Sequence, residues 1–186
     1  MEIKDKVVVI TGAAQGLGKN FAMDLAKRKA RLALADINVE LLEELINGKK
    51  ALVSVFEEIP EDRLNYAYAE GKWSLAEALL HIIDTERIFQ YRALCIARND
   101  KTPLPGFDQD DYVPFSNAAK RSKTDLITEY KTVRDATISL FASFDDEALV
   151  RLGTTSGSKM SVRALGFIIC GHPAHHVRVI QERYLD

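Results

Sequence analysis

GHPAHHVRVIQERY, residues 171–184, contains three of the four histidines of this 186-residue protein, and the fourth, His81, lies in an apolar run that also predicts a helix. Residues three or four apart on a helix share one face, so His172 can present its ring to the same point as His175 or His176. Neutral imidazole binds zinc, nickel, copper and iron, and a site with three protein ligands keeps a position open for water or substrate. The cluster therefore predicts a divalent metal site with His81 as third ligand, against the alternative of ordinary surface or core histidines.

Two neighbouring residues bear on such a site. Asp84 lies one turn after His81 and is expected to support its ring. Pro173 removes a backbone hydrogen bond inside the helix and is expected to bend it between His172 and His176. The sequence offers no dedicated general base, so the predicted chemistry is that of a metal-bound thiol or water.

Apolar positions three and four apart predict four helices along the rest of the chain. Pro60 ends the first helix, and Ser74 with Glu77 has the pattern of a capping box at the start of the second. Residues 99–117 hold three of the five prolines and predict a long crossing, and a polar turn precedes the last helix. Four helices with one long crossing predict a mainly α protein, a four-helix bundle. The expected helices are residues 39–59, 74–98, 118–143 and from about 161 onward.

Two polar or aromatic groups outside the helices are expected to have no binding role. The tyrosines of the 61–72 loop and Trp73 are expected to pack against the bundle. Asp108, Asp110 and Asp111 are expected to form a solvated acidic face, because the glycine and glutamate spacing of a calcium loop is absent.

Composition excludes several classes of protein. The net charge is −2, and the basic residues form no stripe, so a nucleic-acid partner is not expected. No apolar run reaches the roughly 18 residues of a membrane span, and no signal peptide is recognisable, so a cytoplasmic protein without a membrane partner is expected. Cys95 and Cys170 lack paired spacing and are expected to be buried free thiols.

The first 38 residues have a different pattern from the rest. An apolar β-branched run, a glycine-rich turn, a helical pattern and a second apolar run predict one small Rossmann-like βαβ unit. These four segments are residues 6–10, 11–18, 19–29 and 31–36.

The glycine-rich turn resembles the TGxxxGxG fingerprint of the short-chain dehydrogenases/reductases, met by Thr11, Gly12, Gly16 and Gly18. The resemblance implies that a dinucleotide pyrophosphate could approach the helix N-terminus, with Asp36 at the adenosine ribose of NAD. No further βαβ pattern follows in the chain. Residual NAD(P) binding is therefore an alternative function, and no cofactor-binding residue is assigned.

Most of the remaining chain, about residues 40–185, resembles the DinB-like superfamily, also called YfiT-like. The stretches that carry the resemblance are GKWS at 71–74, HIIDTERIF at 81–89, KTPLPGFD at 101–108, SVRALGF at 161–167 and GHPAHH at 171–176.

The resemblance implies a divalent metal, zinc or nickel, bound by His81, His172 and His176, with His175 pointing away from the site. It also implies a transferase or isomerase that uses a low-molecular-weight thiol such as bacillithiol, mycothiol or glutathione, or else a metal-dependent hydrolase.

Two domains are therefore expected, a Rossmann-like βαβ fragment at residues 1–38 and a DinB-like bundle at residues 39–186. Residues 36–43 continue equally well as a dehydrogenase helix or as the first bundle helix, which predicts a chimera. Two parallel strands alone leave unpaired edges, so a homodimer formed by edge pairing is expected. A chimera without retained activity is the remaining alternative.

Overall fold

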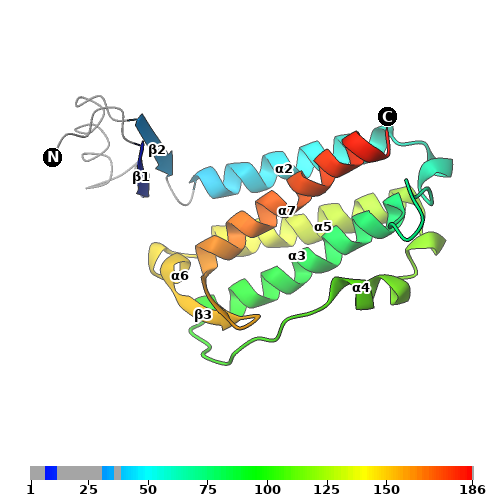
Figure 1. Cartoon of the computed structure of the whole chain (residues 1–186). Coiled ribbons are helices and arrows are strands. Elements are labelled where there is room, and N and C mark those ends of the chain that lie inside the picture. The colour runs from blue at the N-terminus through cyan, green and yellow to red at the C-terminus, as the bar shows by residue number, and fades with distance from the viewer. Residues whose placement is uncertain (1–6, 12–30, 36–38, 186) are drawn as a thin grey trace. The chain divides into compact units, whose positions relative to one another are not determined.

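The computed structural model describes residues 7–11, 31–35 and 39–185 (Figure 1). The chain divides into two compact units, with the boundary between Glu43 and Glu44.

The first unit contains two strands, β1 (Val7–Thr11) and β2 (Arg31–Ala35). They pair in parallel, with Val7 beside Arg31 and Thr11 beside Ala35. The two predicted strands and their parallel direction are confirmed. The glycine turn and the helix predicted between them, and Asp36, lie outside the described residues.

The bundle is built from helices that run alongside one another in Figure 1. Among the described residues the four long helices are α2 (Val39–Glu58), α3 (Leu75–Ala97), α5 (Lys123–Ala142) and α7 (Val162–Arg183). Helix α3 packs against both α5 and α7. The prediction of a mainly α protein with a four-helix bundle is confirmed.

The core lies between these helices and is dominated by aliphatic side chains. Helix periodicity places one apolar stripe of each helix inward, and burial of such side chains is the main source of stability. The largest fully buried apolar residues of the bundle include Leu45, Leu52, Phe56, Ile59, Leu75, Leu79, Ile82, Ile83, Tyr130 and Phe141.

The start of α3 is fixed by a local signal in the sequence. The Ser74 hydroxyl accepts a hydrogen bond from the Glu77 amide (3.3 Å), and the Ser74 amide donates to Glu77 Oε2 (2.7 Å). These contacts satisfy N–H groups that have no partner within the helix. The predicted capping box is confirmed, and it fixes the start of the helix that carries His81.

The third predicted helix begins later than expected. Ala118–Lys120 forms a short 3₁₀ turn, and α5 starts at Lys123, with the Ser122 hydroxyl accepting from the Asp125 amide (3.1 Å). Serine as N-cap explains the boundary, because it offers its side chain to the first turn of the helix.

The polar turn predicted before α7 contains regular structure. It holds α6 (Asp146–Val150) and a hairpin of β3 (Leu152–Thr155) and β4 (Ser158–Ser161). Ser156 and Gly157 connect the strands with positive φ values of 49° and 76°. Two such residues form the tight turn that matches the twist of a two-stranded hairpin.

The long crossing is held against α3 and the hairpin. It carries α4 (Gln109–Tyr112) and is bound to the hairpin through Leu104, whose amide donates to the Thr154 carbonyl (2.9 Å). Arg92 of α3 donates to the Pro105 carbonyl (2.7 Å) and to Ser156 Oγ (3.2 Å). These bonds position the crossing, and with it α4.

Both cysteines, Cys95 and Cys170, are free thiols as predicted, although they are half-buried rather than fully buried. In the described part of the chain, none of the helices combines the length and the apolar character that a bilayer crossing requires.

Candidate metal centre

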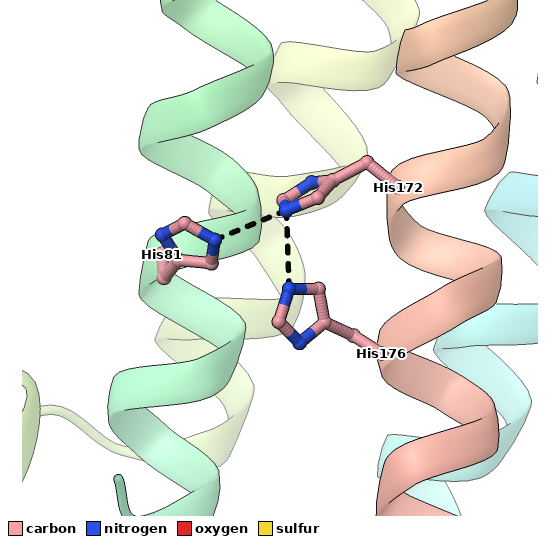
Figure 2. A group of neighbouring side chains, drawn as sticks. All are labelled: His81, His172 and His176. Carbon is pink, nitrogen blue, oxygen red and sulfur yellow. Dashed lines mark hydrogen bonds between the residues drawn. The ribbon is translucent and has the colours of Figure 1, made fainter. Parts of the chain in front are cut away.

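Three histidines meet between α3 and α7 (Figure 2). The Nε2 atom of His172 lies 3.0 Å from that of His81 and 3.1 Å from that of His176. The ligand atoms of all three lie within 4.8 Å of one another. The structure thus brings together the three residues that the sequence predicted.

The distances between these nitrogens suit a single metal ion. At the usual zinc–nitrogen distance of about 2.0–2.1 Å, two ligands of a tetrahedral ion are roughly 3.3 Å apart. Between neutral rings, a hydrogen bond joins an N–H on one nitrogen to a lone pair on the other. His172 Nε2 has two short N···N contacts, but it carries either one proton or one lone pair, so hydrogen bonds between the rings cannot satisfy both contacts. A cation at the point of convergence would satisfy all three lone pairs at once.

Burial keeps these rings neutral. Burial, followed by the nearby His176, His81 and His175, lowers the pKa of His172 to about 3. Burial, followed by His81 and His175, lowers the pKa of His176 to about 4. The pKa of His81 is also lowered by burial, and the charge of Asp110 opposes this effect. At neutral pH the three imidazoles are therefore in the form that binds a metal.

The ring of His81 is supported by Thr85 rather than by Asp84. Thr85 Oγ1 lies 3.4 Å from His81 Nδ1, one turn along α3. Asp84 instead contacts Arg87 (3.5 Å). The prediction for Asp84 was wrong because the ring of His81 points toward α7 and into the bundle, whereas Asp84 lies on a half-exposed side of α3. Trp73, 4.7 Å from His81 between ring centres, packs beside the same imidazole.

His175 lies outside the cluster, as the family resemblance implied. It is exposed, and its Nδ1 lies 3.4 Å from Arg178 Nη2. On α7 the positions four residues apart, His172 and His176, converge instead.

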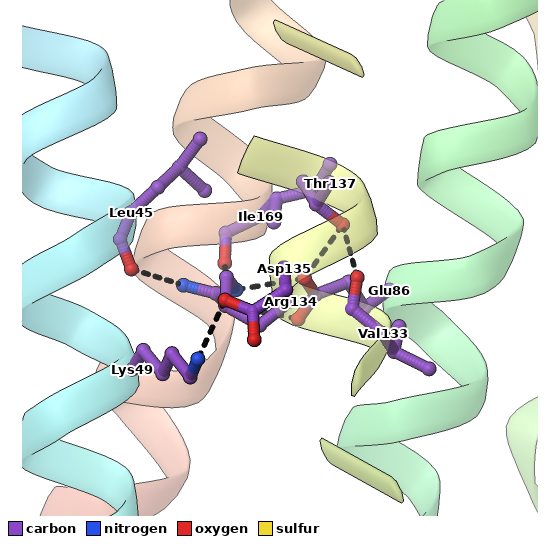
Figure 3. A network of polar contacts seen from close by, with 8 residues as sticks. All are labelled: Leu45, Lys49, Glu86, Val133, Arg134, Asp135, Thr137 and Ile169. Atoms are coloured by element: carbon purple, nitrogen blue, oxygen red, sulfur yellow. Dashed lines mark hydrogen bonds and ion pairs between the residues drawn. The ribbon is translucent and has the colours of Figure 1, made fainter. Parts of the chain in front are cut away.

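Pro173 is accommodated inside α7 by a contact from another helix. Proline has no N–H to donate to the carbonyl four residues earlier, that of Ile169. Arg134 of α5 donates to this carbonyl through Nη2 (3.2 Å), as Figure 3 shows. The helix continues unbroken from Val162 to Arg183, and His172 and His176 remain close enough to share a ligand.

Two pockets open on the cluster. A smaller one of about 290 Å³ reaches His176 and is lined by Lys72, Trp73, Asp110 and His175, among others. A larger one of about 740 Å³ reaches His81 and His172.

Sequence reasoning missed the pocket residues of the loops. Trp73 and Asp110 were expected to be a packing residue and part of a solvated face, yet both line the smaller pocket. Asp110 is exposed, as expected, but α4 places it beside the histidines. No periodicity in the 99–117 segment indicates where α4 lies, so only the three-dimensional arrangement shows this.

The metal-free protein is expected to lose stability as the pH falls from about 7 to about 4. His172 and His176 have folded-state pKa values of about 3 and about 4, below their ordinary value of 6.5, so protonation favours the unfolded chain. Above pH 6.5 the two residues do not make the free energy of unfolding depend on pH. Below that pH this free energy falls, because the unfolded chain takes up protons that the folded protein does not. At 1.36 kcal/mol per unit, we expect a loss of about 3 kcal/mol or more.

Urea unfolding in the presence of EDTA, followed by Trp73 fluorescence, measures this loss. The variant His172→Asn removes the larger shift and should show a clearly weaker dependence over the same range. Identical pH dependence in the two proteins would contradict the expectation.

The fold and the site define a class of protein, a four-helix bundle with a three-histidine cluster suited to a divalent metal. A family model described as the DinB superfamily matches residues 44–180, and the chain belongs to this superfamily.

Solved structures share the fold at low sequence identity. YfiT from Bacillus subtilis, described as a probable metal-dependent hydrolase with an unusual four-helix bundle topology, has a TM-score of 0.67 and 16% identity. The match covers 77% of this chain and 83% of YfiT. A mycothiol-dependent maleylpyruvate isomerase has a TM-score of 0.64 and 10% identity, covering 75% of this chain and 58% of that one. The DinB-like protein YjoA of Bacillus subtilis has a TM-score of 0.54 and 21% identity, and the match covers 76% of this chain and 92% of YjoA.

The N-terminal part is similar to a different family. A short chain dehydrogenase model matches residues 6–61. A protein of Mycobacterium tuberculosis described as the putative oxidoreductase SadH is 35% identical over 123 residues, which cover 65% of this chain and 44% of SadH. An uncharacterized oxidoreductase of Listeria monocytogenes is 49% identical over 51 residues, which cover 27% of this chain and 21% of that protein. The chain therefore spans less than half the length of these relatives.

The two family models overlap at residues 44–61, and most of this overlap lies in α2. The same helix thus fits both families, as the sequence indicated. The chimeric origin stays a prediction.

Proposed function

We propose that His81, His172 and His176 hold a divalent ion, zinc or nickel, and that the protein is a cytoplasmic metal-dependent transferase acting on a low-molecular-weight thiol. The observation that carries the proposal is the convergence of three neutral Nε2 atoms between two pockets, one that reaches His176 and one that reaches His81 and His172. Membership of the DinB superfamily supports it, as does the shared fold of a mycothiol-dependent isomerase.

Several residues around the three histidines have separate roles in the proposed reaction. His81, His172 and His176 would hold the ion, which would supply the positive charge that lowers the pKa of a bound thiol. The three imidazoles are already deprotonated, so binding the ion costs no proton loss from them. Thr85 orients His81, and Trp73 covers one side of its ring. Asp110, which lines the pocket that reaches His176, would accept the proton of the thiol.

A hydrolase is the second candidate. The observation that favours it is the same carboxylate, because Asp110 beside His176 can equally accept a proton from a water molecule. YfiT, which shares the fold, is described as a probable metal-dependent hydrolase. Thiol transfer and hydrolysis differ in what occupies the open position, and this difference can be measured.

The test is spectroscopic. We expect the cobalt(II)-substituted protein to gain an intense near-ultraviolet sulfur-to-metal band when glutathione is added, and the variant His176→Ala to show none. A matched control, His175→Ala, should retain the band, because His175 lies outside the cluster. If the spectrum of the fully metal-loaded protein does not change when glutathione, cysteine or bacillithiol is added, the thiol proposal is refuted in favour of the hydrolase.

A further inference from the structure

The two pockets that reach the histidines differ in chemistry, and α4 contributes to both. Gln109 lines the larger pocket, and the next residue, Asp110, lines the smaller one. The smaller pocket presents Lys72 and Asp110, two groups that can pair with the charged ends of a thiol such as glutathione. The site can therefore be approached by two molecules from two sides.

The larger cavity, about 740 Å³, has apolar walls. Phe89 of α3, Phe107 of the crossing and Ile168 of α7 all line it, together with His81 and His172. Each of these three apolar side chains is half-buried, so each has a free surface toward the cavity. Apolar and aromatic walls with a few polar groups are typical of small-molecule sites.

The aromatic walls are held in place from behind. The Arg92 guanidinium lies 5.1 Å from the ring centre of Phe89 and 5.7 Å from that of Phe107. Arg92 is 4% exposed and donates to the Pro105 carbonyl and to Ser156, so its charge is turned away from the cavity. Phe107 also packs edge-on against Tyr112 at 5.4 Å. A cavity with fixed walls loses little entropy when it takes up a rigid ligand.

The side chains that line the cavity offer an anion no cationic partner. Among the described residues that line it there is no lysine or arginine, and the one charged side chain is the exposed carboxylate of Asp108. We propose that this cavity binds the second substrate of the transfer, a neutral electrophile with an aromatic ring, while the thiol enters from the pocket of Lys72 and Asp110. The proposal rests on the thiol-transfer function proposed above.

A conjugate addition illustrates the step. The thiol sulfur gives up its proton to Asp110 and forms a bond to the β-carbon of an unsaturated ketone. The π electrons of the carbon–carbon double bond move toward the carbonyl oxygen, and the α-carbon then takes up the proton. Nothing is oxidised or reduced, and there is no leaving group.

The experiment uses one pair of matched variants on α7. Ile168→Trp, one turn before His172, fills the apolar cavity, and Val179→Trp, one turn after His176, fills the polar pocket. The probe is benzylacetone, a neutral aromatic ketone that the thiol cannot attack, with binding to the metal-loaded protein measured by equilibrium dialysis. We expect Ile168→Trp to weaken its binding at least tenfold and to keep the glutathione–cobalt band. We expect Val179→Trp to keep benzylacetone binding and to lose the glutathione–cobalt band.

Three results would overturn the proposal. They are no binding of benzylacetone to the unmodified protein, unchanged binding in Ile168→Trp, and, in the metal-free protein, binding of the anion phenylpropionate equal to that of benzylacetone. If Ile168→Trp does not fold, Phe89→Ala replaces it, with an expected fivefold or greater loss of benzylacetone binding at unchanged metal content. Absence of the glutathione band from the unmodified protein, with its benzylacetone binding intact, would remove the thiol function and leave the cavity assignment, so the two failures are distinguishable.

Discussion

Replacing Glu86 with alanine is expected to lower the free energy of unfolding by about 3–5 kcal/mol, the usual effect of breaking a buried ion pair. Glu86 Oε1 accepts from Arg134 Nε (2.7 Å) and from Thr137 Oγ1 (2.8 Å), and Oε2 accepts from Arg134 Nη2 (2.8 Å). Both charged side chains are almost completely buried, at 0% and 2% exposure. The change would leave the guanidinium buried without its counter-charge (Figure 3). Urea unfolding at neutral pH measures the loss.

A neighbouring ion pair provides the control. Asp135 pairs with Lys49 at 2.5 Å, but its side chain is 61% exposed. Surface pairs contribute little, so Asp135→Ala should cost less than about 0.5 kcal/mol. The double variant Glu86→Leu with Arg134→Met should lose less stability than Glu86→Ala alone, because no unpaired charge stays buried. A Glu86→Ala protein as stable as the Asp135→Ala protein would show that the buried pair contributes nothing.

Replacing His172 with alanine is expected to weaken metal binding by more than about 100-fold. His172 is the central residue of the cluster, since its Nε2 lies within 3.1 Å of the other two. Changes to residues that only support ligands already cost about 10–100-fold, so loss of a ligand should exceed that range. Elemental analysis and competition with a chelator measure the affinity on protein purified without a histidine tag.

His175→Ala is the matched control, one turn of the same helix away and exposed. It should keep its metal within about threefold of the unmodified affinity, because a histidine outside the first and supporting contacts has little influence on the ion. Metal retained by the His172→Ala protein, or lost equally by both variants, would refute the assigned ligand set.

The helices and the histidine cluster could be predicted because their signals are local. Helix periodicity, the Ser74–Glu77 capping box and the HxxxH spacing each depend on residues within one or two turns. The choice of His176 over His175 required the family resemblance. His81 could be joined to the pair because α3 and α7 pack together, as a bundle predicts.

The loops could not be predicted in the same way. The position of α4 depends on bonds that Leu104 and Arg92 make to a hairpin 50 and 64 residues later in the chain, and no local pattern encodes such contacts. The role of Thr85 was missed because a hydroxyl four residues from a histidine is a common pattern, whereas a carboxylate at Asp84 is more conspicuous. The direction in which each side chain points, rather than its residue type, determines that Thr85 and not Asp84 contacts His81.

The contact between Arg134 and the Ile169 carbonyl limits the order in which this pair of residues can have evolved. Without the guanidinium, Pro173 would leave a buried carbonyl unpaired, at a cost of about 1–3 kcal/mol. A carbonyl has two lone pairs, so Arg134 can be accepted in a helix that still has an ordinary residue at 173. The arginine can therefore precede the proline in a lineage at little cost, and a lineage that loses the arginine first would carry the penalty until position 173 changes too.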